Sequence, residues 1–106
     1  MLPVAGDWNG DGIDTPGLYQ NGIWFLKNSN SGGVADITFW YGGAPGMLPV
    51  TGDWNGDGID TPGLYQNGIW FLKNANSGGV ADITFWYGGA PGMLPVAGDW
   101  SVTIQG

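Results

Sequence analysis

The residues best suited to chemistry in this sequence are aspartates that recur in two short segments. In each segment side-chain oxygens stand at the first, third and fifth positions, Gly at the sixth and a backbone carbonyl at the seventh. This is the ligand order of the first half of a calcium loop, in which short side chains surround a hard cation and Gly permits the turn. The candidate calcium ligands are Asp7, Asn9, Asp11, the Ile13 carbonyl and Asp14, and in the second segment Asp53, Asn55, Asp57, the Ile59 carbonyl and Asp60.

The same segments also suit a turn that holds no metal. Asp and Asn side chains stabilise turns by accepting hydrogen bonds from nearby backbone N–H groups. The acidic residue that closes a complete calcium loop at its twelfth position is missing, because Leu18 and Leu64 stand there. Three side-chain ligands predict weak calcium binding or none. The sequence therefore leaves two interpretations open, a calcium site and a metal-free turn.

Other chemistry finds little support in the composition. The chain has no His, Cys or Glu, so the commonest general bases and thiolate ligands are lacking, and we expect no enzyme activity. A net charge of −7 with only two Lys argues against nucleic acid as a partner. No apolar run approaches the roughly 20 residues of a membrane span, so we expect no membrane partner.

The sequence consists of two nearly identical repeats and part of a third. Residues 1–46 and 47–92 differ only where Ala5 corresponds to Thr51 and Ser29 to Ala75. A truncated third repeat occupies residues 93–106; it follows the pattern to Trp100 and then diverges into a tail. A period of this length is typical of solenoids and propellers. Such near-identity indicates recent duplication or deliberate construction.

Each repeat predicts four strands and no helix. In the first repeat we expect strands over residues 2–5, 17–20, 23–28 and 37–41. Asn21-Gly22 predicts a two-residue type I′ hairpin, because both central residues of that turn need a positive φ. The abundant Gly and Pro would break a helix. The predicted fold class is therefore all-β, with four-stranded antiparallel sheets.

Apolar residues occupy both faces of these predicted sheets. Ile23 and Phe25 point to one side of their strand, and Trp24 and Leu26 to the other. Trp40 likewise lies opposite its apolar neighbours. Sheets of this kind need cover on both sides, as the blades of a β-propeller have, whereas an aligned two-sheet sandwich would keep a wet outer face on each sheet.

Two blades cannot close a ring, so we expect homo-oligomerisation to complete it. A repeating face that meets its own complement gives a heterologous contact, which either closes into a ring or runs on as a filament. Since propellers have about 4–8 blades, the expected rings are trimers or tetramers, and we favour the tetramer. The surplus copy of the first strand, residues 93–100, either completes a blade across a subunit junction or is a tail without that role.

Residues 1–100 resemble bacterial FG-GAP/VCBS-type propeller repeats. The resemblance lies in the segment PVAGDWNGDGIDTPGLYQNGIWFLKN and in DITFWYG after it. It implies a propeller fold, a secreted or cell-surface setting, and calcium in loops similar to those of integrin α-subunit propellers. Integrin-type loops close with Asp at the ninth position, where this chain has Thr15 and Thr61.

Carbohydrate binding is the alternative function, as a multivalent lectin-like propeller. Aromatic rings stack on sugar faces, and this chain has many of them. At strand periodicity the same side chains also suit an inter-blade core. The candidate glycan-stacking residues are Trp8, Trp24, Trp40 and Tyr41, with their equivalents Trp54, Trp70, Trp86 and Tyr87.

Overall fold

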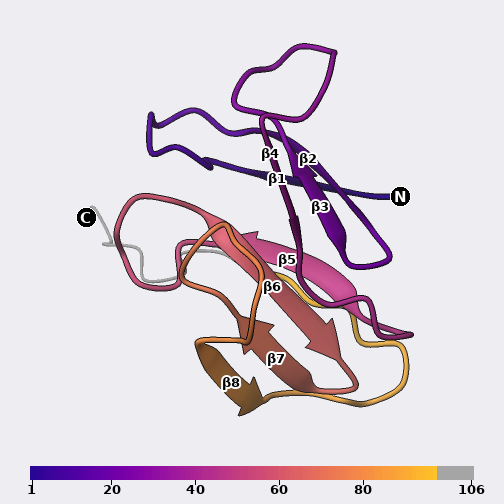
Figure 1. Ribbon diagram of the computed structural model, residues 1–106. Helices are drawn as coiled ribbons and strands as arrows, with labels where there is room; N and C mark the ends of the chain where they lie inside the picture. The colour runs from indigo at the N-terminus through magenta and orange to yellow at the C-terminus, as the bar shows by residue number, and fades with distance from the viewer. Residues whose placement is uncertain (98–106) are drawn as a thin grey trace, which may run out of the picture.

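The computed structural model describes residues 1–97, so Trp100 and the divergent tail lie outside the described residues. Within this range the chain is all-β, with eight strands and no helix (Figure 1). The described residues therefore include no helix long and apolar enough to cross a membrane. The strands are β1 (Leu2–Gly6), β2 (Thr15–Gln20), β3 (Ile23–Leu26), β4 (Ile37–Trp40), β5 (Leu48–Gly52), β6 (Thr61–Gln66), β7 (Ile69–Leu72) and β8 (Ile83–Trp86).

Each repeat forms one four-stranded antiparallel sheet in which neighbours in sequence are neighbours in space. Sheet 1 has the order β1-β2-β3-β4, and sheet 2 the order β5-β6-β7-β8. The registers of the two sheets match, with Leu2 opposite Tyr19 in the first and Leu48 opposite Tyr65 in the second. The predicted all-β class and the four strands in each repeat are confirmed.

Four predicted strand limits were wrong, two of them by a single residue: the first strand ends at Gly6 and the fourth at Trp40. The third strand ends at Leu26 and not at Asn28, because the Asn28 N–H donates to the Asp36 carboxylate at 2.7 Å instead of continuing the ladder. The second strand begins at Thr15 and not at Gly17, since its pairing with β1 extends to Gly6 opposite Thr15.

The predicted hairpin between β2 and β3 is confirmed by its backbone angles. Asn21 and Gly22 have φ values of 50° and 92°, and Asn67 and its Gly neighbour repeat them at 49° and 91°. Positive φ at both central residues is the signature of a type I′ turn, whose twist matches that of the flanking strands. Local sequence thus fixes the register of β2 and β3.

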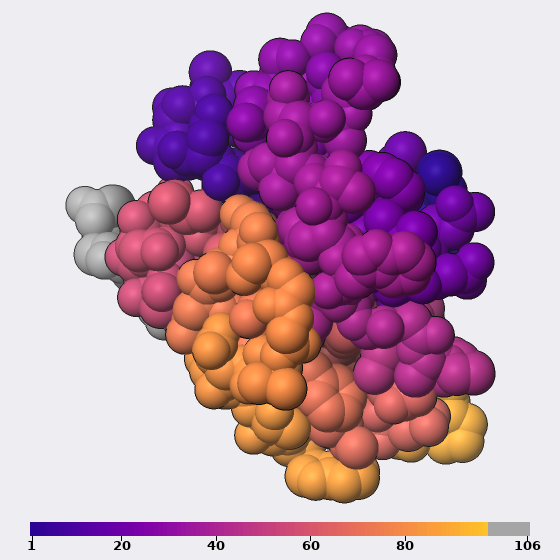
Figure 2. Space-filling view, in the orientation of Figure 1, coloured from indigo at the N-terminus to yellow at the C-terminus, as the bar shows by residue number. Residues whose placement is uncertain are grey.

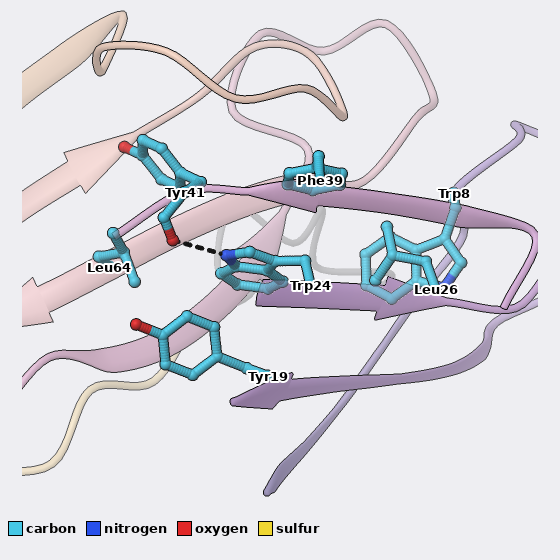
Figure 3. Close-up of a cluster of buried hydrophobic side chains, with 7 residues drawn as sticks. All are labelled: Trp8, Tyr19, Trp24, Leu26, Phe39, Tyr41 and Leu64. Atoms are coloured by element: carbon cyan, nitrogen blue, oxygen red, sulfur yellow. Dashed lines mark hydrogen bonds between the residues drawn. The ribbon is translucent and has the colours of Figure 1, made fainter. Parts of the chain in front are cut away.

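The main core lies between the two sheets and is built on Trp24 (Figure 3). This indole is fully buried, and its Nε1–H donates to the Tyr41 carbonyl at 2.9 Å. Phe39 stacks on it with ring centroids 6.0 Å apart, and Tyr19 packs at 5.0 Å from the other side. Trp8, Leu26 and Leu64 complete the cluster.

Sheet 2 contributes Leu64 of β6 to this core. The face of sheet 1 that carries Trp24 therefore packs on the face of sheet 2 that carries Leu64, and these two faces are not equivalent in the repeat. The Tyr41 hydroxyl donates to the Phe71 carbonyl across the contact at 2.9 Å. At Gly42, which has φ +99°, a Cβ atom would lie 2.6 Å from Leu64, so Gly permits both the turn and this close approach. In Figure 2 the purple surface of the first repeat lies directly against the orange surface of the second.

The structure confirms that both faces of each sheet are apolar. In sheet 1, Trp24 and Leu26 face sheet 2, while Phe25 and Leu18 lie on the side that sheet 2 does not cover. Leu18 is 39% exposed, but its equivalent Leu64 is only 1% exposed. On the other face, Tyr41 is 6% exposed and its equivalent Tyr87 is 74% exposed. One apolar face of each sheet is therefore covered by the other sheet of the same chain, and the second apolar face is not covered by a sheet.

Candidate metal-binding loops

The two Asp-rich segments form matching loops after β1 and after β5, and both lie at the left of Figure 1. Each loop connects the first strand of its sheet to the second, and its glycines take left-handed conformations. Gly10 and Gly12 have φ values of 77° and 85°, and Gly56 and Gly58 have 75° and 86°. Glycine is the residue that adopts such angles without strain. The chain thus wraps around its own Asp and Asn side chains.

Asp7 stands at the centre of the first loop and accepts three backbone hydrogen bonds. Its Oδ1 accepts from the N–H groups of Gly10 at 2.8 Å and Asp11 at 3.1 Å, and its Oδ2 from Gly12 at 2.8 Å. Asn9 Oδ1 accepts from the Asp11 N–H at 3.2 Å. These are the contacts expected of a carboxylate-stabilised turn.

The second loop repeats this arrangement around Asp53. Its Oδ1 accepts from the Asp57 N–H at 3.0 Å and its Oδ2 from Gly58 at 2.8 Å. Asn55 Oδ1 accepts from the same Asp57 N–H at 3.3 Å. The fifth-position Asp of each loop accepts from the N–H of the Ile two residues later, at 2.9 Å in both. The side chains at the first, third and fifth positions of each loop are therefore brought together.

Asp60, the last acid of the second loop, reaches the other repeat. Its Oδ2 accepts the Asp7 N–H at 2.7 Å, and its own N–H donates to the Asp7 carbonyl at 2.8 Å. This reciprocal pair joins the two loops across the contact between the sheets. Asp14, the equivalent residue of the first repeat, is exposed and lines a hollow that also contains Asp53 and Asp60.

The carboxyl pKa values follow these contacts. For Asp7, partial burial raises the pKa, but the N–H groups of Gly12, Gly10 and Asp11 outweigh it and hold the pKa below its ordinary value. The Gly58 N–H is the main cause of a lowered pKa at Asp53. Burial raises the pKa of Asp60, opposed by the Asp7 N–H and reinforced by nearby carboxylates.

The chemistry of the loops fits a hard cation, but the number of ligands is small. All of the grouped atoms are oxygens, which calcium prefers, yet three side chains and one carbonyl fall short of the 6–8 ligands that it takes. Each of these side chains already accepts at least one N–H through an oxygen, although a carboxylate oxygen keeps a further lone pair. Within residues 1–97, no three acidic side chains gather into a cluster that could hold a metal ion. Water would have to supply the remaining ligands.

The aromatic glycan candidates divide sharply by exposure. Trp8, Trp24 and Trp70 are buried in the two hydrophobic clusters, and Trp54 packs against the second. Tyr41 is buried under sheet 2, so these residues serve as core. Trp40 and Trp86 differ: they are 66% and 74% exposed, although sheet 1 covers the face of sheet 2 on which Trp86 lies. One tryptophan in each repeat is therefore exposed to solvent, and Trp86 is exposed even though its face meets the other sheet.

Sequence reasoning missed three groups that tie the repeats together. The Thr51 hydroxyl donates to the Ala5 carbonyl at 2.7 Å, and Asn76 Nδ2 donates to the carbonyls of Trp8 at 3.4 Å and Asp60 at 3.2 Å. Asp60 is the third, because the sequence indicated it as a calcium ligand and not as a contact between the repeats. Thr51 carried the one available signal, because it is one of the two positions at which the repeats differ.

A search of protein-family models, curated proteins and solved structures finds no match to this chain. The resemblance to FG-GAP/VCBS-type repeats therefore stays a prediction that depends on the residues alone.

Proposed function

We propose that this chain is a self-assembling, non-catalytic scaffold in which each sheet is one blade of a β-propeller. The observation that carries the proposal is a pair of complementary faces. The open face of sheet 1 has the same residues as the face of sheet 2 that sheet 1 covers, with Leu18 and Phe25 corresponding to Leu64 and Phe71. The open face of sheet 2, with Tyr65, Trp70 and Tyr87, likewise matches the covered face of sheet 1. A second copy can therefore repeat the contact that one chain already makes.

The open face of sheet 1 is hollowed and apolar. A cavity of about 700 Å³ lies over it, lined by residues that include Pro3, Leu18, Phe25, Val34 and Thr38. In sheet 2 the equivalents of Pro16 and Leu18, which are Pro62 and Leu64, are fully buried. Covering apolar surface of this kind is the main favourable term in protein association. The occupant that fits is the aromatic face of sheet 2 from another copy.

The positions of the innermost strands support a radial arrangement. Residues of β1, β5 and the third copy line one shared hollow: Pro3, Val4, Pro49, Val50, Thr51, Pro95, Val96 and Ala97. Innermost strands that gather around a common space are what propeller blades present at their axis. Because the contact joins two different faces, it either closes into a ring of chains, which then has an even number of blades, or runs on as a filament. We favour four chains and eight blades over three chains and six.

The test is the mass of the chain in solution by light scattering, compared with the 11.1 kDa of one chain. We expect a single species at a multiple of that mass, four-fold for the favoured ring and three-fold for the smaller one. A homogeneous single chain at micromolar concentration would contradict the proposal.

Calcium in the two loops is a further part of this proposal. Asp7, Asn9, Asp11 and the Ile13 carbonyl would contact the ion, as would Asp53, Asn55, Asp57 and the Ile59 carbonyl. We expect millimolar calcium to raise the melting temperature and a chelator to reverse the shift, because a ligand that binds only the folded state stabilises it. The matched control is the Asp11→Asn/Asp57→Asn double variant, which keeps the turn's side-chain acceptors but loses two charges. An equal shift in both proteins, or none in either, would refute the calcium sites.

Glycan binding is the second candidate, and the exposure of Trp40 and Trp86 favours it. Sugars that stack on these indoles would quench their fluorescence. We expect quenching by the binding sugar to disappear in the Trp40→Ala/Trp86→Ala variant, while the buried tryptophans continue to emit. If a panel of glycans leaves the fluorescence of the unchanged chain unaltered, the lectin function is refuted.

A further inference from the structure

Residues 93–97 leave sheet 2 by the same turn through which residues 47–51 leave sheet 1. The Met47 N–H donates to the Ala44 carbonyl at 3.3 Å, and the Met93 N–H donates to the Ala90 carbonyl at 3.2 Å. The glycines of the two turns have matching φ values, 99°, 103° and 82° in the first and 101°, 104° and 84° in the second. The turn that places β5 beside sheet 1 thus directs the third copy along the equivalent path beside sheet 2.

The surroundings of this segment agree with that path. Pro95, Val96 and Ala97 share a hollow with residues of β5, and β5 shares the same hollow with β1. On its other side the segment lines a cavity with Tyr65, Trp70 and Tyr87, on the open face of sheet 2. Residues 93–97 therefore stand where the innermost strand of a third blade belongs.

Within residues 1–97, no strand pairs with this segment. The equivalent strands β1 and β5 are paired along their whole length with β2 and β6. Leu94 and Val96 are 77% and 72% exposed, whereas Val50, which corresponds to Val96, is 6% exposed. Unpaired backbone groups in an extended segment are a template for pairing with another strand.

A second copy that docks on sheet 2 brings its own β1 to the same position. Residues 93–97 and 1–5 are both Met-Leu-Pro-Val-Ala, so either can pair with the β2 strand of the incoming copy. Only one can occupy that edge. On the basis of the proposed assembly, we infer that residues 93–97 are the donor strand, which pairs with β2 of a second copy and displaces that copy's β1. The donor is already held in place by its turn, while the incoming β1 would have to expel it.

One hydrogen bond between repeats provides the means to tell the two strands apart. The Thr51 hydroxyl donates to the Ala5 carbonyl, which lies opposite Pro16, a residue with no N–H to offer. The next such junction lies between β5 and the strand beyond it. There the Thr51 carbonyl lies opposite Pro62 and would accept a hydrogen bond from a hydroxyl on that strand in the same way. The strand that stands there has Ala at the donating position in either case: Ala97 of the same chain or Ala5 of the second copy.

The experiment compares the Ala97→Thr and Ala5→Thr variants by the concentration dependence of assembly in sedimentation. If residues 93–97 are the donor, the new hydroxyl of Ala97→Thr holds them in place. The dissociation constant should then fall about five-fold per junction, which is the equivalent of one net hydrogen bond. Ala5→Thr should have no effect. If the second copy keeps its own β1, the signs reverse: Ala5→Thr strengthens assembly, and Ala97→Thr weakens it because the segment is harder to expel.

The outcomes separate this inference from the proposed function. An unchanged chain that never associates refutes both. An assembly that responds to Ala5→Thr, or to neither variant, leaves the self-assembling scaffold intact and overturns the donor strand.

Discussion

Leu18→Asp should convert the proposed assembly into single folded chains. Leu18 lies on the open face of sheet 1 and is 39% exposed in the chain by itself, so a charge there remains in contact with water and costs the fold little. Docking of a second copy would bury the carboxylate as its equivalent Leu64 is buried, and Lys27, the cation that lines the same hollow, already faces Asp36 at 3.9 Å. An uncompensated buried charge costs about 3–5 kcal/mol. The dissociation constant should therefore rise at least 100-fold at each junction.

Light scattering and circular dichroism measure the two halves of this prediction. The mass should fall to that of one chain, while the strand signal is retained. Val80→Asp is the matched control, because Val80 is 84% exposed even though its sheet is covered by sheet 1. That variant should assemble like the unchanged chain. If Leu18→Asp also assembles normally, the open face of sheet 1 is not the interface.

The elements of this fold were predictable because they depend on neighbouring residues. The Asn-Gly turns fix the β2–β3 and β6–β7 hairpins, and strict alternation around Trp24 places apolar groups on both faces. The strand ends were less predictable, since Asn28 leaves the ladder for the side chain of Asp36, eight residues away. A competing side-chain acceptor at that distance leaves no mark on the strand's own sequence.

The contacts between repeats could not be read in the same way. Tyr41 and Tyr87 have the same neighbours in sequence, yet one donates to Phe71 under sheet 2 and the other is exposed. Exposure here depends on the position of a repeat within the stack, not on its sequence. The same holds for Asp60, whose carboxylate joins the loop of the first repeat while Asp14 remains exposed. Identical residues take different roles because the stack has two ends.

Trp24→Ala should be the most destabilising single substitution in the chain. The indole is fully buried, stacks on Phe39 and donates to the Tyr41 carbonyl, so its removal leaves both a cavity and an unpaired acceptor. Truncation of a buried tryptophan costs about 3–5 kcal/mol, against about 5–15 kcal/mol for the whole stability of a domain. Urea unfolding followed by circular dichroism measures the loss. The Leu18→Asp background keeps assembly from masking it.

Two companion variants separate the causes of that loss. Trp40→Ala removes the same side chain from the neighbouring strand, where it is 66% exposed, and should cost less than about 1 kcal/mol. Trp24→Phe keeps a ring in the core but leaves the Tyr41 carbonyl unpaired, which should cost about 1–3 kcal/mol. Because Tyr41 also donates to sheet 2, loosening of its carbonyl should weaken the contact between the sheets as well as sheet 1 itself. Equal losses at Trp24 and Trp40 would mean that the sheets are not held together by this core. The contact between sheets on which the proposed assembly depends would then have no support.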